Sequence, residues 1–259
     1  MHELALKAPS GVVSRALAVL ETLARERQPV RLSALAARLS MQKSTTHRAL
    51  ATLVRLGYAE QDPESGRYRA TLRIWELGAG LVAQHPIKRA AATFVQRLHQ
   101  TTGETVSLTI LSGPDVLYLD RLVAARQVRF AAQIGSRFPA ALTAGGKAML
   151  AYEPDATVAI AHARESIQST PAAGSDSRLR ALDALPQELV IARHRGYATS
   201  SSHPAVMSFG APVLATTGRA TGAISVSAPR SRVSEAKRQA IVDHLLGTCA
   251  DLAERTGDL

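Results

Sequence analysis

A run of hydrogen-bond donors opens one otherwise apolar segment of the chain. Residues 40–50 read SMQKSTTHRAL, and apolar Leu53, Val54 and Leu56 follow. Hydroxyl groups beside positive charge can bind phosphates and the acceptor atoms of base edges, so the pattern favours a nucleic-acid partner. The side chains of this segment that we expect to contact DNA are Lys43, Ser44, Thr45, His47 and Arg48.

The elements around this segment predict a winged helix-turn-helix. Apolar residues repeat at helical spacing over 13–24, and Pro29 ends that first helix. Ser33 is a suitable N-cap for a short second helix, and the donor-rich segment opens a third helix that Gly57 closes. Two short extended runs around a turn at 62–66 read as a β-hairpin. The third helix of such a domain enters the major groove by its N-terminal turns.

The predicted hairpin carries two further basic residues. Arg67 and Arg69 alternate with Tyr68, so both arginines can face one side as a wing over the DNA backbone or minor groove. The distribution of charge agrees with contact to DNA. Residues 1–57 hold nine Lys and Arg against three acids, within a chain of net charge +10. The alternative is a solvated first turn on a small helical domain, and DNA binding accounts for more of the pattern.

Composition bounds the remaining possibilities. A chain of 259 residues with 46% hydrophobic residues predicts two folded domains. A single cysteine, Cys249, excludes an intrachain disulfide and fits a reducing cytoplasm. The N-terminus lacks the apolar core of a signal peptide, and the chain lacks an apolar run of about 18 residues, so we expect no membrane span.

Motifs for catalysis and for metal binding are weak. The Ser-x-x-Lys pattern at 40–43 has no Lys-Thr-Gly partner, and the Gly145-Gly146-Lys147 stretch lacks the first glycine and the Ser/Thr of a phosphate loop. The eight histidines show no His-x-x-x-His spacing and no clustering with the cysteine. We therefore predict no catalytic residues, no metal and no cofactor.

The rest of the chain predicts an α+β domain. An amphipathic helix over 86–103 precedes two alternating strands within 104–123. A second strand pair surrounds residues 217–219, and a long amphipathic helix ends the chain. We expect helices on one side of an antiparallel sheet. Between the two domains, Leu72, Trp75, Leu81 and Val82 could form the apolar seam of a linker helix.

Four segments, at 14–24, 43–78, 138–151 and 195–229, make the chain resemble the IclR-type transcriptional regulators. The third, FPAALTAGGKAMLA, and the fourth, which contains SFGAPVLATTGRATGAISVSAP, are the most specific in this order and at this distance. The resemblance implies a winged helix-turn-helix at 1–71, a linker helix at 72–84, and a GAF-like effector-binding and oligomerisation domain at 85–259.

The resemblance also implies an effector pocket in the second domain. In relatives, backbone N–H groups at the positions of Ala144 and Gly145 face a ligand oxyanion, and strand hydroxyls at those of Ser225 and Ser227 contact effector. Ser208 stands where cysteine is usual. The other reading of these serines is ordinary strand polarity with backbone partners. The expected effector-binding residues are Ala144, Gly145, Ser200, His203, Ser208, Ser225 and Ser227.

One loop departs from the pattern of the family. The TSSSHPA stretch at 199–205 stands where relatives carry an acidic run, and we expect Ser200, Ser201, Ser202 and His203 to line the pocket mouth. Reduced negative charge there favours an anionic ligand, and Arg126 or Arg129 could add a positive partner.

The sequence thus predicts a cytoplasmic DNA-binding regulator, a repressor or an activator, controlled by a small aliphatic or aromatic organic acid. Its expected partners are a palindromic double-stranded operator, the effector, and further copies in a homodimer or tetramer. One alternative is a regulator whose second domain only oligomerises. The other is an enzyme fused to a DNA-binding domain.

Overall fold

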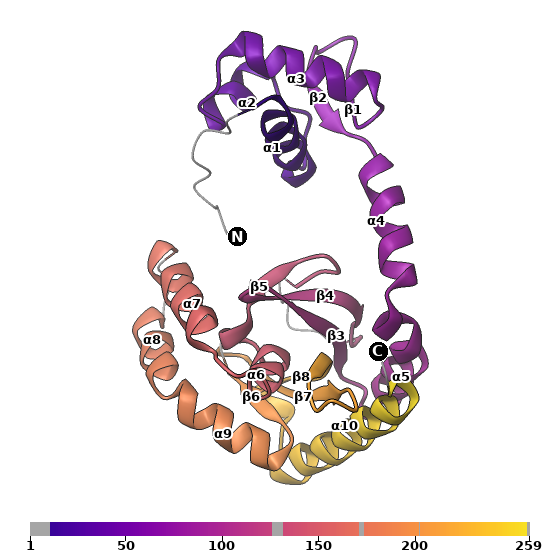
Figure 1. The fold of residues 1–259 in the computed structure, drawn as a ribbon, viewed down its shortest axis with the longest axis vertical. Helices are drawn as coiled ribbons and strands as arrows, with labels where there is room; N and C mark the ends of the chain where they lie inside the picture. Colours follow the sequence, from indigo (N-terminus) through magenta and orange to yellow (C-terminus); the bar gives the residue numbers. More distant parts are fainter. Residues whose placement is uncertain (1–10, 126–131, 171–173, 202, 258–259) are drawn as a thin grey trace. The chain divides into compact units, whose positions relative to one another are not determined.

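Three helices and a hairpin form the first part of the chain in a computed structural model, which describes residues 11–125, 132–170, 174–201 and 203–257 (Figure 1). The chain divides into two compact units, Met1–Leu81 and Val82–Leu259. The elements of the first unit are α1 (Val12–Arg25), α2 (Leu32–Arg38), α3 (Lys43–Arg55), β1 (Ala59–Gln61) and β2 (Tyr68–Ala70). The apolar stripes of the three helices meet in one core that includes Val19, Leu35 and Leu50.

The hairpin is attached to the helices by backbone pairing. Strand β1 pairs antiparallel with β2, and Val30 forms an isolated bridge with Tyr68. Tyr68 is buried while its neighbours Arg67 and Arg69 are exposed, as the alternation predicts. The predicted winged helix-turn-helix is confirmed.

The predicted N-cap of α2 is wrong. The helix begins at Leu32, so Arg31 is the N-cap and Ser33 lies inside the first turn. The Arg31 carbonyl accepts from the N–H groups of Ala34 and Leu35. Because Val30 is held in the bridge with Tyr68, the extended segment ends at once and the chain turns into the helix two residues before the serine.

Helix α4 (Arg73–Gln84) follows the hairpin. It has no buried residue, and Trp75, Leu77 and Leu81 are exposed, with Trp75 at 68% and Leu81 at 74% exposure, whereas Ile74 and Val82 are half-buried. The two compact units divide within it, between residues 81 and 82.

The second unit is built on a six-stranded antiparallel sheet of order β5-β4-β3-β8-β7-β6. Its strands are β3 (Thr105–Ser112), β4 (Asp115–Leu122), β5 (Arg137–Pro139), β6 (Ala198–Ser200), β7 (Val206–Leu214) and β8 (Ala220–Pro229). Its α-helices are α5 (Pro86–Thr102), α6 (Ala144–Leu150), α7 (Thr157–Ser169), α8 (Ser175–Asp183), α9 (Leu185–Arg195) and α10 (Glu235–Thr256). Two 3-10 turns, η1 (Ala140–Leu142) and η2 (Arg230–Arg232), precede α6 and α10.

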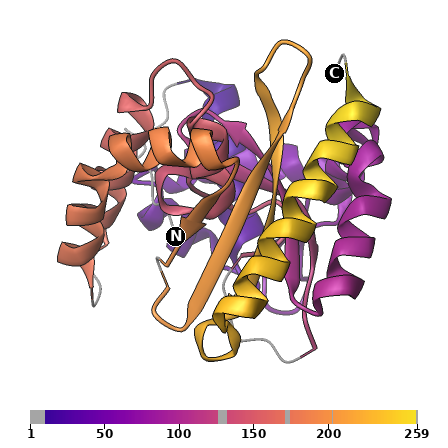
Figure 2. The same cartoon turned by 90° about the horizontal axis from the view of Figure 1, so that it is seen from below.

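Helices cover both faces of this sheet, so the prediction of helices on one side is wrong. One apolar core joins α5 and α10 to residues such as Val106, Phe209 and Ile224. A second core joins the α6–α9 region to residues such as Val116 and Ala223. Figure 2 shows α10 beside α5 on one side of the strands and the orange helices on the other. Alternate residues of β8 point to opposite faces, and apolar residues on both faces require two helical layers.

The predicted α+β class, with an antiparallel sheet flanked by helices, is confirmed. Among the described residues, no helix combines the length and apolar character that a membrane crossing needs.

Candidate functional site

The first turns of α3 present polar side chains to solvent. Lys43, Ser44, His47 and Arg48 are exposed, and Thr45 is half-buried. On the opposite side of the helix, Thr46, Ala49, Leu50 and Leu53 are buried. The helix therefore separates a core stripe from a donor-rich face, which suits insertion into the major groove.

The two wing arginines have different surroundings. Arg69 pairs with Glu60, its cross-strand partner in the β1–β2 ladder. Arg67 donates a long hydrogen bond of 3.5 Å to the Pro29 carbonyl. The turn between the strands is held by Asp62, which accepts from the Ser65 hydroxyl at 2.7 Å and from the Ser65 N–H at 2.6 Å, and these two hydrogen bonds lower the pKa of Asp62. The hairpin thus presents two cations, Arg69, which is paired with a carboxylate, and Arg67, for which no carboxylate partner occurs among the described residues.

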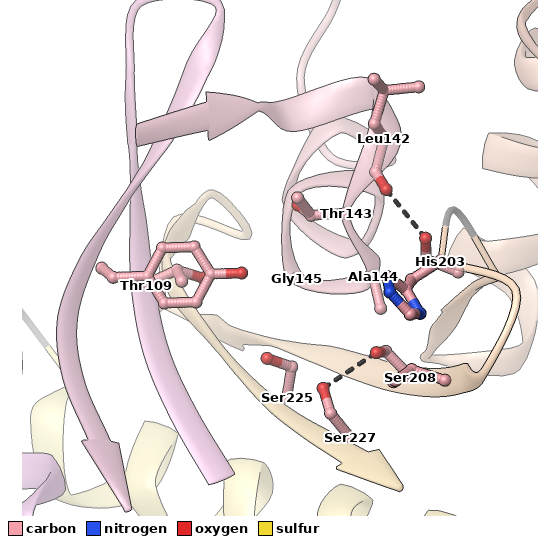
Figure 3. A pocket seen from close by; sticks show the side chains of 12 residues that line it. Thr109, Leu142, Thr143, Ala144, Gly145, His203, Ser208, Ser225 and Ser227 are labelled. Carbon is pink, nitrogen blue, oxygen red and sulfur yellow. Dashed lines mark hydrogen bonds between the residues drawn. The ribbon is translucent and has the colours of Figure 1, made fainter. Parts of the chain in front are cut away.

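A pocket in the second unit brings together all seven residues expected to bind effector (Figure 3). They come from the start of α6, the end of β6, the following loop, and strands β7 and β8. Ser201 does not line this pocket, and Ser202 lies outside the described residues, as do Arg126 and Arg129. Five further residues line it, and sequence reasoning did not assign them: Thr109, Tyr118, Leu142, Thr143 and Val206.

The start of α6 supplies backbone donors to the pocket. Thr143 is the N-cap, and its Oγ1 accepts from the Gly146 N–H at 3.0 Å. Within the described residues, the N–H groups of Ala144 and Gly145 have no acceptor, as is usual in a first helical turn. These two groups can donate to an oxyanion.

Glycines bring the backbone of α6 unusually close to its neighbours. A Cβ atom on Gly210 of β7 would lie 2.4 Å from the Ala144 carbonyl carbon and 2.5 Å from the Gly145 nitrogen. A Cβ on Gly146 would lie 2.2 Å from the Ala140 carbonyl oxygen. Side chains at either position would displace the helix, so these glycines fix where the two N–H groups lie.

Three serines line the pocket from the neighbouring strands. Ser208 and Ser227 are opposite each other in the β7–β8 register, and their hydroxyl oxygens are 2.8 Å apart. Ser225 is 7% exposed and shares a face of β8 with Ser227. A Cβ on Gly145 would lie 3.9 Å from Ser225 Oγ, so the strand hydroxyl and the α6 backbone face the same small space.

The other predicted pocket residues have structural roles as well. Ser200 donates to the Leu142 carbonyl at 2.8 Å, which joins β6 to the turn before α6. His203 Nδ1 accepts from the Ala205 N–H at 3.2 Å. Ser200 therefore has a backbone partner in addition to its place in the pocket lining.

Tyr118 adds a neutral donor. Its ring is 7% exposed and packs edge-on against Phe138 with centroids 5.8 Å apart. Burial raises the pKa of Tyr118, so its hydroxyl keeps its proton. Tyr118 and Thr109 lie on β4 and β3, far along the chain from the segments that suggested the pocket. Thr109 alternates with apolar residues along its strand. This alternation is the one signal in the sequence that indicates a different environment for Thr109 from that of its apolar neighbours.

Two other clusters of ionisable side chains lie outside the pocket. Glu104, 1% exposed, pairs with Arg232 at 2.7 Å and Lys237 at 2.5 Å. Asp115 accepts from His162 at 2.9 Å. No group of three or more His, Cys, Asp or Glu side chains that could hold a metal occurs in the described parts of the chain.

The winged helix-turn-helix with its polar α3 face, joined to a second α+β unit with a pocket, defines a DNA-binding transcriptional regulator. The chain belongs to the IclR family. Residues 79–254 match the family model of the bacterial transcriptional regulator IclR C-terminal domain, and residues 12–63 match that of the IclR helix-turn-helix domain.

Individual relatives agree with this assignment. The HTH-type transcriptional regulator XynR of Escherichia coli (strain K12) is 30% identical over 228 residues, which cover 87% of this chain and 88% of XynR. A crystal structure of an IclR transcriptional regulator from Alicyclobacillus acidocaldarius has 25% identity and a TM-score of 0.75, and covers 95% of this chain and 98% of that one. An IclR homologue from Microbacterium hydrocarbonoxydans, complexed with 4-hydroxybenzoate, shares the fold with 23% identity and a TM-score of 0.74, over 94% and 98% of the two chains. These relatives are transcriptional regulators and not enzymes.

Proposed function

We propose that this regulator binds its operator through α3 and the wing, and that a small organic acid in the pocket at α6 controls the binding. The observation that carries the proposal is the convergence of Ala144, Gly145, Ser208, Ser225 and Ser227 on one pocket. Backbone N–H groups and neutral hydroxyls can satisfy a carboxylate without neutralising it, and none of the described residues that line the pocket carries a carboxylate that would repel one. A protein of the same fold is known in complex with 4-hydroxybenzoate, an organic acid, which supports the ligand class.

The side chains proposed to contact DNA lie on α3 and on the β1–β2 hairpin. The exposed positions of Lys43, Ser44, His47 and Arg48 support their contact with bases and phosphates, and Thr45 lies at the edge of the same face. Arg67 and Arg69 would reach the backbone or the minor groove from the hairpin.

Assembly follows from the geometry of DNA reading. One recognition helix covers a few base pairs, so a palindromic operator calls for two copies related by two-fold symmetry. Trp75 and Leu81 of α4, and Leu72 just before its first residue, are exposed in the single chain, which supports a dimer formed through this linker helix. Pairing of the second domains would then give a tetramer.

The test is operator affinity measured with and without a panel of small organic acids, for the wild type and for Ser225→Ala. We expect the acid that changes the affinity of the wild type to need a concentration about tenfold to a hundredfold higher in the variant, since each lost hydrogen bond to a charged group costs about 1.5–3 kcal/mol. Operator affinity without the acid should be equal in the two proteins.

If both proteins respond at the same concentration of acid, the effector binds elsewhere. If no acid changes operator affinity and none binds the protein, the second domain only oligomerises, which is the second candidate function.

A further inference from the structure

The hydroxyl pair formed by Ser208 and Ser227 has a defined hydrogen-bonding capacity. The two side chains face each other across β7 and β8 at 2.8 Å and both line the pocket (Figure 3). One hydroxyl must donate to the other. The accepting serine then keeps its own O–H for a third group, and the donating serine keeps free lone pairs. The pair therefore offers one donor and one acceptor side by side.

This combination discriminates between oxygen-bearing ligands. A ligand hydroxyl can accept from one serine and donate to the other through a single oxygen atom. A ketone oxygen can only accept, so it leaves the second serine without a partner. A methylene group satisfies neither. A site built to bond a ligand hydroxyl rejects analogues that lack it, because its polar groups then remain unpaired.

The rest of the pocket limits the size of the ligand. The cavity volume that is open to the centres of water molecules is about 40 Å³. This volume has room for roughly three waters. Leu142, Val206 and Tyr118 close its walls, and a side chain on Gly145 would meet Thr109 Oγ1 at 2.8 Å. A short aliphatic acid suits this space better than an aromatic ring does.

We propose that the effector is a short hydroxycarboxylate whose hydroxyl group is bound by the Ser208–Ser227 pair. The inference rests on the proposed function, which supplies the site for the carboxylate. It adds the class of acid and assigns the two serines as specificity-determining residues.

The experiment is titration calorimetry of the full-length protein with L-lactate, D-lactate, pyruvate, propionate and benzoate. We expect one lactate enantiomer to bind roughly tenfold more tightly than pyruvate, as one net hydrogen bond would give, and propionate and benzoate to bind more weakly still. Ser227→Ala and Ser208→Ala should each bring lactate and pyruvate to equal affinity. Ser201→Ala is the matched control, because Ser201 is an exposed serine of the adjacent loop that does not line the pocket.

Operator binding without ligand serves as the check that each variant is folded. Equal affinity of the wild type for lactate and pyruvate would overturn the role of the serine pair, as would a preference for lactate that survives in both alanine variants. Tighter binding of benzoate than of lactate would overturn the size argument. In each of these cases the proposed function would still stand if some acid changes the operator affinity of the wild type and has a weaker effect on the Ser225→Ala variant. If no acid binds the protein and none alters its operator affinity, both the proposed function and the proposal of a hydroxycarboxylate effector are wrong.

Discussion

Thr143 caps the first turn of α6 by accepting the Gly146 N–H at 3.0 Å. The cap occupies the third N–H of the helix, and the two before it, of the pocket-lining residues Ala144 and Gly145, have no acceptor within the described part of the chain. One threonine therefore both stabilises the helix and determines which of its donors remain for a ligand.

We expect Thr143→Val to lower the free energy of unfolding by about 1 kcal/mol, because valine keeps the side-chain shape and cannot accept the hydrogen bond. Denaturant unfolding of the full-length protein measures this. Thr143→Ser should retain the wild-type value, and Thr217→Val, in the exposed β7–β8 hairpin, controls for the new apolar surface. Equal unfolding of the Thr143→Val variant and the wild type would show that the cap adds nothing.

Arg48→Ala should abolish specific operator binding while the protein stays folded. A bidentate contact from arginine to guanine contributes about 1–3 kcal/mol of discrimination. A mobility-shift assay with operator and non-operator DNA separates this effect from loss of charge. The control is Arg97→Ala, which removes an exposed arginine from α5 in the other unit. Unchanged operator affinity would exclude Arg48 from base reading.

Glu60→Gln should strengthen DNA binding. Glu60 pairs with Arg69 on the wing, so its neutralisation frees that guanidinium for phosphate. One more phosphate contact would steepen the dependence of the logarithm of affinity on the logarithm of salt concentration by about 0.9. Glu64→Gln removes the same charge from the hairpin turn, where Glu64 is exposed. Matching salt slopes for the two variants would mean that net charge alone, and not the release of Arg69, changed the affinity.

Glu104→Gln should destabilise the second unit strongly. This carboxylate is 2% exposed in its side chain and pairs with both Arg232 and Lys237. Breaking a buried pair by removing one partner costs about 3–5 kcal/mol, since the remaining cations stay partly desolvated. Chemical denaturation measures the loss, and Glu254→Gln, on the exposed side of α10, should unfold like the wild type. A loss below that of an ordinary surface substitution would contradict the structural role given to Glu104.

Trp75→Glu should convert the protein to monomers at micromolar concentration. In the proposed dimer the exposed apolar residues of α4 contact a partner copy, and a carboxylate at position 75 would have to be desolvated on pairing. Light scattering measures the mass. Gln84→Glu adds the same charge at an exposed polar position of α4 and should leave the assembly intact. A monomeric wild type would refute the proposed dimer.

Local patterns predicted most of the elements. The 3.6-residue stripe of α3 reflects burial on one side, which leaves a periodic trace in sequence. In β3 the alternation separates apolar Val106 and Leu108, which lie in one core, from the hydroxyl-bearing residues of the other face, which are buried as well. The start of α2 was missed because Val30 pairs with Tyr68, a contact across 38 residues that local capping preferences do not contain. The second helical layer was missed for a similar reason, since which face of the sheet each helix covers depends on packing between distant segments.

The pocket was predicted in part. Ser225 and Ser227 could be placed together because residues two apart share a face of a strand. Tyr118 and Thr109 could not be assigned, because the β3–β8 pairing that brings the β3–β4 hairpin to the pocket joins segments more than a hundred residues apart. The unbonded N–H groups of Ala144 and Gly145 depend on the cap at Thr143, which the sequence analysis did not use.

The contact at Gly210 gives the second unit a mechanical property. Where most helices rest on a sheet through side chains that can change rotamer, α6 rests on β7 main chain against main chain. The two backbones are in direct contact at that point. A ligand that displaces the Ala144 and Gly145 amides therefore cannot be accommodated by a side-chain rearrangement there. A displacement of these amides must therefore displace strand β7 as well, so the helix and the strand move as one rigid unit.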